Sequence, residues 1–172
     1  MLRKQLVGAL GALAALLVIG LLARHVASLA SWVTLPPDHA GGRLGFAVHW
    51  LVLPGLTLLA GIIGASRRGF YEDAIDGTRT PANHSLEINL RYNVNTVEQV
   101  VLAAIAWCAL AVTLPHQQLL LIPAMALVFV FGRVTFWVGY LIHPMGRDFG
   151  MTLTVFPTLL AYAWLGRQMM LG

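Results

Sequence analysis

The chain has 172 residues, of which 58% are hydrophobic and only 10% are charged, and its formal net charge is +4. A mean hydropathy of +0.76 is too high for a soluble domain of this length, so the composition indicates one polytopic membrane domain. Basic residues in such a protein report topology and lipid contact, so the charge does not indicate nucleic-acid binding. The single cysteine, Cys108, excludes an intrachain disulfide, and the sequence has no zinc-ligand spacing.

The N-terminal segment, residues 1–43, is predicted to hold a transmembrane helix over 6–22 and an irregular connection over 23–43. Arg3 and Lys4 precede the apolar run, and this pattern is also that of a signal peptide with a cleavage-like site at 28–30. We favour an uncleaved helix because the apolar run is long for a signal peptide.

A second span is predicted over 44–65, with a kink or loosened turn at Pro54. The only substantial polar loop follows, over 66–86. Three carboxylates in this loop raise the alternative of a metal site: Glu72, Asp73 and Asp76. We read this short cluster as part of a solvated loop that balances nearby arginines, and we predict no metal site.

Three further spans are predicted over 88–114, 119–142 and 149–165. The turn over 115–118 is short, so the third and fourth spans are expected to be antiparallel neighbours. Pro157 predicts a bend in the fifth span.

The third span carries a polar face near its start. Arg91, Asn95 and Glu98 stand at i, i+4 and i+7 and therefore share one side of a helix. Charged side chains cost roughly 2.5–3.5 kcal/mol in the centre of a bilayer, so they usually face protein or a wet cavity. The alternative is that Arg91 lies at the membrane interface and pairs with Glu98.

The fourth span carries a second polar set. Arg133 lies in the middle of an apolar run, Tyr140 follows seven residues later on the same helical face, and Arg147 comes seven residues after that. A guanidinium offers five donors in a rigid fork that suits carboxylates. If the two polar faces meet, they form a small anion-binding pocket inside a membrane.

The basic residues predict the orientation of the chain. With five spans and a cytoplasmic N-terminus, six basic residues fall on the cytoplasmic side: Arg3, Lys4, Arg67, Arg68, Arg79 and Arg147. Three fall on the other side: Arg24, Arg43 and Arg167. The positive-inside rule therefore favours a cytoplasmic N-terminus, and the two polar faces then converge toward the cytoplasmic half.

The motif Arg91-x-x-x-Asn95-x-x-Glu98, followed by Arg133 and Tyr140 with Arg147 beyond them, resembles the MAPEG family, the membrane-associated proteins of eicosanoid and glutathione metabolism. The resemblance covers about residues 44–172. It implies an all-α integral membrane bundle with a four-helix core over 44–172, plus one extra N-terminal helix within 1–43. The chain looks more like the bacterial branch, the microsomal glutathione transferase-like members, than the eicosanoid enzymes.

The resemblance implies glutathione as co-substrate, bound near the cytoplasmic side between subunits of a homotrimer. Arg91 and Arg133 would hold carboxylates, and Asn95, Glu98 and Tyr140 would bind other polar groups of the tripeptide.

Arg147 would be the catalytic residue, because a nearby guanidinium stabilises a thiolate over a thiol and the thiolate is the nucleophile. The acceptor would be a lipophilic electrophile or a lipid hydroperoxide. Two positions depart from the family pattern. Gln99 stands where several members have an aromatic residue, and Phe136 stands where some members have tyrosine.

Two functions stay open at this point, and an isomerase-like or transport role is a third, weaker option. One is a membrane-bound glutathione transferase or peroxidase in the inner membrane of a bacterium. The other is a non-catalytic membrane protein whose arginines bind lipid headgroups or bridge subunits.

Overall fold

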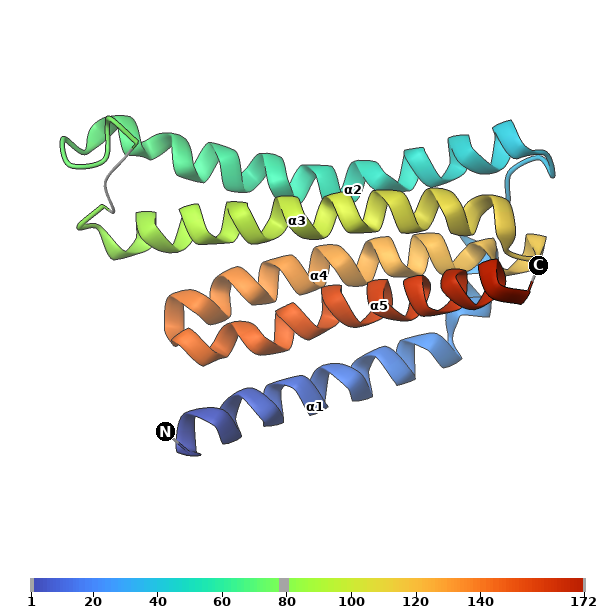
Figure 1. The fold of residues 1–172 in the computed structure, drawn as a ribbon, viewed down its shortest axis with the longest axis horizontal. Coiled ribbons are helices and arrows are strands. Elements are labelled where there is room, and N and C mark those ends of the chain that lie inside the picture. The colour runs from blue at the N-terminus through green and yellow to red at the C-terminus, as the bar shows by residue number, and fades with distance from the viewer. Residues whose placement is uncertain (1, 78–80, 172) are drawn as a thin grey trace.

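The structure is a computed structural model that describes residues 2–77 and 81–171. This part of the chain forms five long helices, namely α1 (Leu2–Arg24), α2 (Ala40–Ser66), α3 (His84–Thr113), α4 (Leu121–Ile142) and α5 (Arg147–Leu171) (Figure 1). Short 3-10 helices complete the connections: η1 (Val26–Ser31), η2 (Arg67–Phe70), η3 (His116–Leu120) and η4 (Pro144–Gly146). Each of the five spans is long and apolar enough to cross a membrane. The prediction of an all-α membrane bundle is confirmed.

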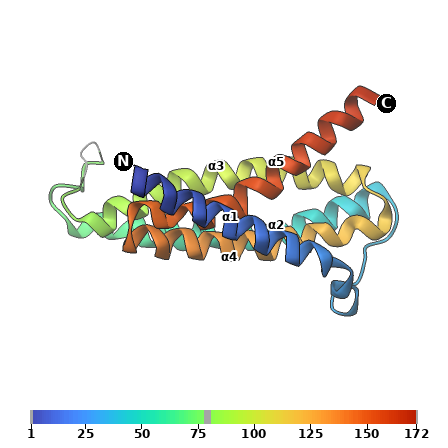
Figure 2. The same cartoon turned by 90° about the horizontal axis from the view of Figure 1, so that it is seen from below.

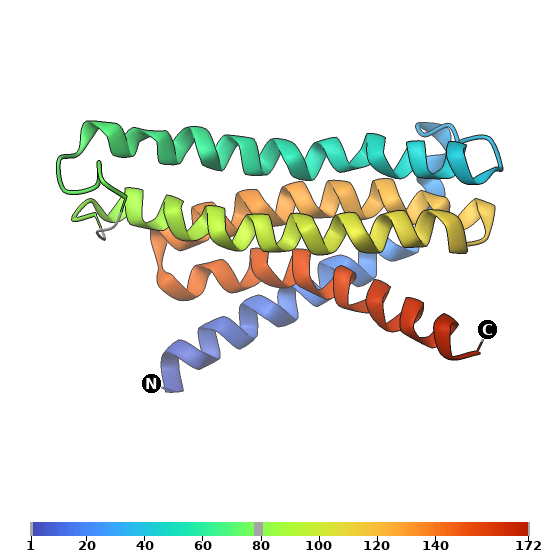
Figure 3. The same ribbon diagram turned by 45° about the horizontal axis from the view of Figure 1, so that its top comes forward.

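Consecutive helices run in opposite directions, and the two termini lie at opposite ends of the bundle (Figures 1 and 3). The most extensive packing joins α2 to α3 and α4 to α5, and α1 lies on the outside against α5. The second half of α5 turns away from the other helices (Figure 2), in agreement with the bend expected at Pro157, which lies inside this helix. The start of α3, the end of α4 and the start of α5 all lie at the end of the bundle that holds the N-terminus.

The observed start of a helix differs from the predicted start where the first residues of the helix are polar. The third span was expected from residue 88, but α3 begins at His84 because the side chain of Asn83 accepts a hydrogen bond from the Leu86 amide at 3.0 Å. The hydropathy pattern does not detect such a cap. α2 runs through Pro54 as one helix, so the loosened turn expected there does not interrupt it.

The polar loop between α2 and α3 is partly ordered by its own carboxylates. Asp73 accepts a hydrogen bond from the Ala82 amide at 2.6 Å. No group of three side chains suited to a metal ion occurs within residues 2–77 and 81–171. Arg79, which contributes to the predicted orientation, lies outside the described residues, as do the side chains of Arg3 and Lys4.

At the opposite end of the bundle, Arg43 joins the connection between α1 and α2 to the end of α3. Its guanidinium donates to the carbonyls of Ala111 and Leu114, at 3.3 and 2.8 Å, and so satisfies the C-terminal end of α3. It also pairs with Asp38 at 2.6 Å. The hydrogen bond from Arg43 holds the pKa of Asp38 below its ordinary value. The connection from α1 to α2 is therefore attached to the end of α3.

Close approach of α4 and α5 depends on glycines that face each other across the helix pair. A Cβ on Gly150 would overlap the carbonyl oxygen of Gly132 and the amide of Phe136, and Gly139 and Gly146 meet in the same way further along the pair. The atoms in the way are backbone atoms, which cannot rotate aside. The register of α4 on α5, and with it the distance between Arg133 and the start of α5, therefore depends on these small residues.

We expect Gly150→Ala to lower the stability of the protein by about 1–3 kcal/mol, the usual cost of overpacking a tight contact. Gly166→Ala, on the same helix, is the matched control because no atom lies within 4 Å of the place that its Cβ would take. This control is expected to be neutral or slightly stabilising, since alanine favours helix more than glycine does. Thermal unfolding of the detergent-solubilised variants measures both effects, and equal midpoints for the two would contradict the argument.

Candidate functional site

A buried arginine lies at the centre of the polar groups. The side chain of Arg133 on α4 is fully buried. Its Nη1 donates to Oδ1 of Asn95 on α3 at 2.8 Å, and its Nη2 donates to Oγ1 of Thr154 on α5 at 2.6 Å. Its Nε has no partner in the described part of the chain. One guanidinium therefore joins three helices.

Two further arginines lie nearer the membrane surface, on either side of Tyr140. The guanidinium carbon of Arg147 lies 4.8 Å from the centroid of the Tyr140 ring. The phenol of Tyr140 lies close enough to Arg91 for the two groups to interact electrostatically. Arg91 in turn donates two hydrogen bonds to Glu87, at 2.7 and 3.0 Å. The side chains of Arg91 and Arg147 remain 61% and 40% exposed, so a ligand can reach both.

The buried and the exposed groups are connected by Phe136. Its ring centroid lies 4.6 Å from the guanidinium carbon of Arg133 and 5.9 Å from the ring of Tyr140. A guanidinium over an aromatic face is stabilised by the ring quadrupole. The arginines at positions 133 and 147 are thus linked through two aromatic side chains in contact, and the predicted meeting of the two polar faces is present in the structure.

Glu98 is the one predicted site residue outside this group. It is exposed and makes no hydrogen bond or ion pair with another residue in the described part of the chain. The alternative in which Glu98 pairs with Arg91 is wrong, because the partner of Arg91 is Glu87, one turn before it on α3.

Comparison with known proteins identifies the family. The sequence model of the MAPEG family matches residues 46–167, which include α3, α4 and most of α2 and α5. The chain belongs to the MAPEG family. It matches no curated protein and no solved structure. With five apolar helices, this MAPEG protein is an integral, multi-pass membrane protein, and α1 lies outside the matched residues.

Two groups in the candidate site were not among the predicted residues. Thr154, the acceptor for Arg133, is uncharged, but it stands seven residues after Arg147 and so shares its helical face. Glu87 stands four residues before Arg91, the spacing at which a glutamate and a following arginine pair along a helix. The spacing of Glu87 and Arg91 predicts their pairing, whereas the spacing of Thr154 gives only its helical face and not its contact with Arg133 on another helix.

A small apolar cavity of about 220 Å³ lies next to the polar groups, between α3 and α5. It is lined by Leu102, Val155, Leu159 and Tyr162, together with Gln99 and Thr158. Gln99 and Thr158 each stand one helical turn beyond a partner of Arg133, and the buried carbonyl oxygen of Gln99 has no hydrogen-bond partner in the described residues. The cavity therefore places an apolar surface and one unpartnered hydrogen-bond acceptor beside the polar groups.

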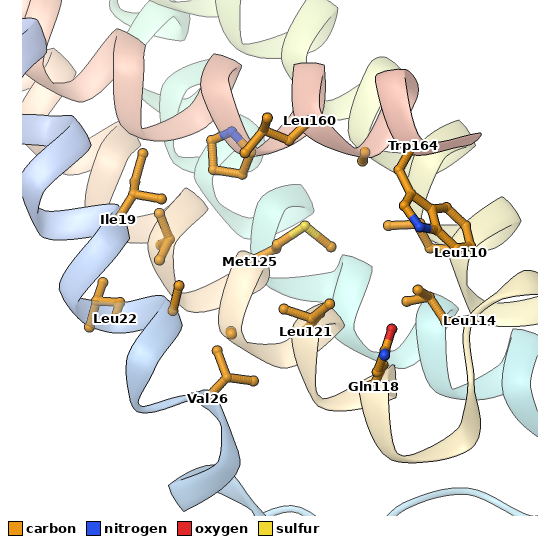
Figure 4. A pocket seen from close by; sticks show the side chains of 15 residues that line it. Ile19, Leu22, Val26, Leu110, Leu114, Gln118, Leu121, Met125, Leu160 and Trp164 are labelled. Atoms are coloured by element: carbon orange, nitrogen blue, oxygen red, sulfur yellow. The ribbon is translucent and has the colours of Figure 1, made fainter. Parts of the chain in front are cut away.

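A larger apolar cavity of about 340 Å³ lies at the opposite end of the bundle. It is enclosed by the second halves of α1 and α5 and the first half of α4, and Figure 4 shows Ile19 and Leu22 facing Leu160 and Trp164 across it. Gln118 supplies the main polar group of its wall. None of the predicted site residues lines this cavity.

Proposed function

We propose that this protein is a membrane-bound glutathione-dependent transferase or peroxidase that acts on a lipophilic electrophile or a lipid hydroperoxide. The observation that carries the proposal is the arrangement of Arg91, Asn95, Tyr140 and Arg147 around the buried Arg133 at one end of the bundle. Glutathione carries two carboxylates and a thiol, which these donors match, and an amino group, which needs an acceptor such as Glu98. Membership of the MAPEG family supports the same substrate.

The exposed groups would bind the tripeptide directly. Arg91 is available for a carboxylate because Glu87 occupies only part of its fork, and Glu98 is available for the amino group. The amide oxygen of Asn95 is occupied by Arg133, so its NH2 group is the part left to donate to a ligand. The hydroxyl of Tyr140 would supply one further hydrogen bond.

Arg133 would act indirectly, because it is buried beneath these groups. Its guanidinium is fully covered in the single chain, so it holds the amide of Asn95 in place and adds positive charge to the site instead of offering a free fork to a carboxylate. In this proposal Arg133 is a positioning residue for Asn95.

Arg147 would stabilise the thiolate of glutathione. In a transferase reaction the thiol proton passes to water, the sulfur electron pair forms a bond to the electrophilic carbon, and the leaving group departs with its bonding pair. In a peroxidase reaction the thiolate takes one oxygen of the hydroperoxide and releases an alcohol after protonation. A second glutathione then reacts with the sulfenic acid to give a disulfide and water.

The acceptor would enter from the bilayer. The apolar cavity between α3 and α5 lies beside the buried polar groups, and its size suits part of an apolar chain rather than a whole lipid. The unpartnered carbonyl of Gln99 would accept a hydrogen bond from a donor on the acceptor molecule.

The proposed assembly is a homotrimer with the site between subunits. Support comes from the outward face of α3, where exposed apolar side chains lie between Arg91 and Glu98 and beyond them: Val94, Val97, Val101 and Ile105. A second copy on this face would bring another subunit next to Glu98. The proposed orientation puts the N-terminus and the polar site on the cytoplasmic side of a bacterial inner membrane, supported by Arg67, Arg68 and Arg147 at that end.

The experiment that tests this function is glutathione binding by the purified, detergent-solubilised protein, with an ultraviolet scan for thiolate at neutral pH. We expect saturable binding and a thiolate band. S-methylglutathione is the control, since it has no ionisable thiol and should bind without the band. Absence of binding at millimolar glutathione would refute the proposal.

The second candidate is a non-catalytic MAPEG-fold protein that binds membrane lipid, and the cavity beside α1 favours it. The lining of this cavity is almost wholly apolar and suits an acyl chain. Native mass spectrometry of the protein with phospholipid separates the two candidates. Retained lipid without glutathione binding would support the second, and glutathione binding would support the first.

A further inference from the structure

The additional helix α1 packs on the segment that carries Arg147. Its first half lies against η4 and the start of α5. A Cβ on Gly8 would overlap the carboxylate of Asp148, and a Cβ on Gly11 would lie 3.4 Å from the amide of Phe149. Glycine at these two positions allows the backbone of α1 to approach the first turn of α5. The α1 side of this contact lies outside the residues shared with the MAPEG family model.

Asp148 is held between α1 and Arg147. One of its carboxylate oxygens lies 4.0 Å from Nε of Arg147, and the other faces Gly8. Its side chain is 29% exposed, so solvent screens its charge only in part. The carboxylate lies in the first turn of α5, where the helix dipole stabilises a negative charge.

We propose that Asp148, kept in place by α1, restrains Arg147 by partly neutralising its charge at the thiolate position. This inference rests on the proposed function. A carboxylate beside the guanidinium reduces the positive potential that a bound thiolate experiences, so less of the glutathione is ionised than Arg147 alone would allow. Asp148 is a positioning residue for Arg147, and a shift of α1 changes the ionisation of the bound thiol.

The other charged and titratable groups around this pair are few. Tyr140 lies under the Arg147 guanidinium, Arg91 lies beyond Tyr140, and His143 lies in the turn before η4, where its Nδ1 accepts a hydrogen bond from the Met145 amide. Residues 5–23 of α1 include no titratable side chain. Within the described side chains, Asp148 is therefore the one acidic group beside Arg147.

The test compares the thiolate fraction of bound glutathione in the full-length protein and in Asp148→Asn, which preserves the shape of the side chain and removes its charge. At a pH below the midpoint of thiol ionisation, we expect the thiolate fraction to rise at least roughly threefold, the change produced by half a unit in that midpoint. Gly8→Leu, which crowds the carboxylate from the α1 side and toward Arg147, is expected to lower the fraction. Gly20→Leu is the matched control, because nothing lies within 4 Å of that position.

The outcomes separate this inference from the proposed function. Glutathione binding by both proteins, with an unchanged or smaller thiolate fraction in Asp148→Asn, would overturn the restraint and leave the function intact. An absence of glutathione binding by the wild-type protein would overturn both. A change in Gly20→Leu as large as in Gly8→Leu would show that α1 acts without the Gly8–Asp148 contact and would also overturn the inference.

Discussion

Arg147→Ala is expected to remove the thiolate band of bound glutathione at neutral pH and to lower kcat by about 10²–10³-fold, the usual cost of deleting one group that stabilises developing charge. The physical reason for this expectation is the position of Arg147. It is a partly exposed cation at the surface end of the polar groups, and it stacks on Tyr140. Absorbance titration of the protein with glutathione, followed by turnover of a lipophilic electrophile, measures both quantities.

Two control variants make this result specific. Arg147→Lys keeps a cation without the planar fork and should retain part of the thiolate band. Arg167→Ala removes an arginine near the C-terminal end of α5, far along the helix from Arg147, and should change neither the band nor the rate. A full band in Arg147→Ala would show that another group ionises the thiol. A third outcome is possible, in which the parent protein shows no thiolate band and Arg147→Ala only loses the oligomer, as measured by size-exclusion chromatography. This outcome would favour a structural role of the arginines.

The helices and the meeting of the two polar faces could be predicted from the sequence because both depend on simple periodicities. Apolar runs of the right length predict spans, and spacings of four and seven residues put Arg91 with Asn95, and Arg133 with Tyr140, on common faces. The short turn between α3 and α4 then requires an antiparallel arrangement, which brings the start of one to the end of the other.

The partners within the site could not be predicted in the same way, because they depend on how helices rotate against one another. The glycines at positions 132 and 150 allow α5 to approach α4, and this approach places the hydroxyl of Thr154 under Arg133. Hydropathy treats threonine and glycine as neutral positions and gives no sign of such contacts. The same limit explains why Arg133 was expected to hold a carboxylate directly, whereas the packing of three helices covers it completely.

Arg133→Met is expected to leave the ligand-free protein as stable as the wild type, or to stabilise it by up to about 4 kcal/mol, and to abolish stabilisation by glutathione. Arg133 is fully buried and forms no ion pair with any described residue, so its charge is desolvated without a carboxylate in compensation. Methionine fills a similar volume without a charge. Thr154 can still donate to the carbonyl of Met151 at 3.0 Å, and the half-buried Asn95 can turn toward water.

Asn95→Leu provides the contrasting variant, because it removes a partner and leaves the charge. We expect it to cost about 1.5–3 kcal/mol in the wild-type background, the usual contribution of a hydrogen bond to a charged group, and far less in the Arg133→Met background. The measurement is a double-mutant cycle: the thermal stability of the wild type, the two single variants and the double variant is compared with and without glutathione. A strongly destabilised Arg133→Met protein would mean that the three-helix hydrogen bonds stabilise the fold more than the buried charge opposes it. Arg133 would then belong to the structure of the bundle, and the charge of the site would reside in Arg91 and Arg147.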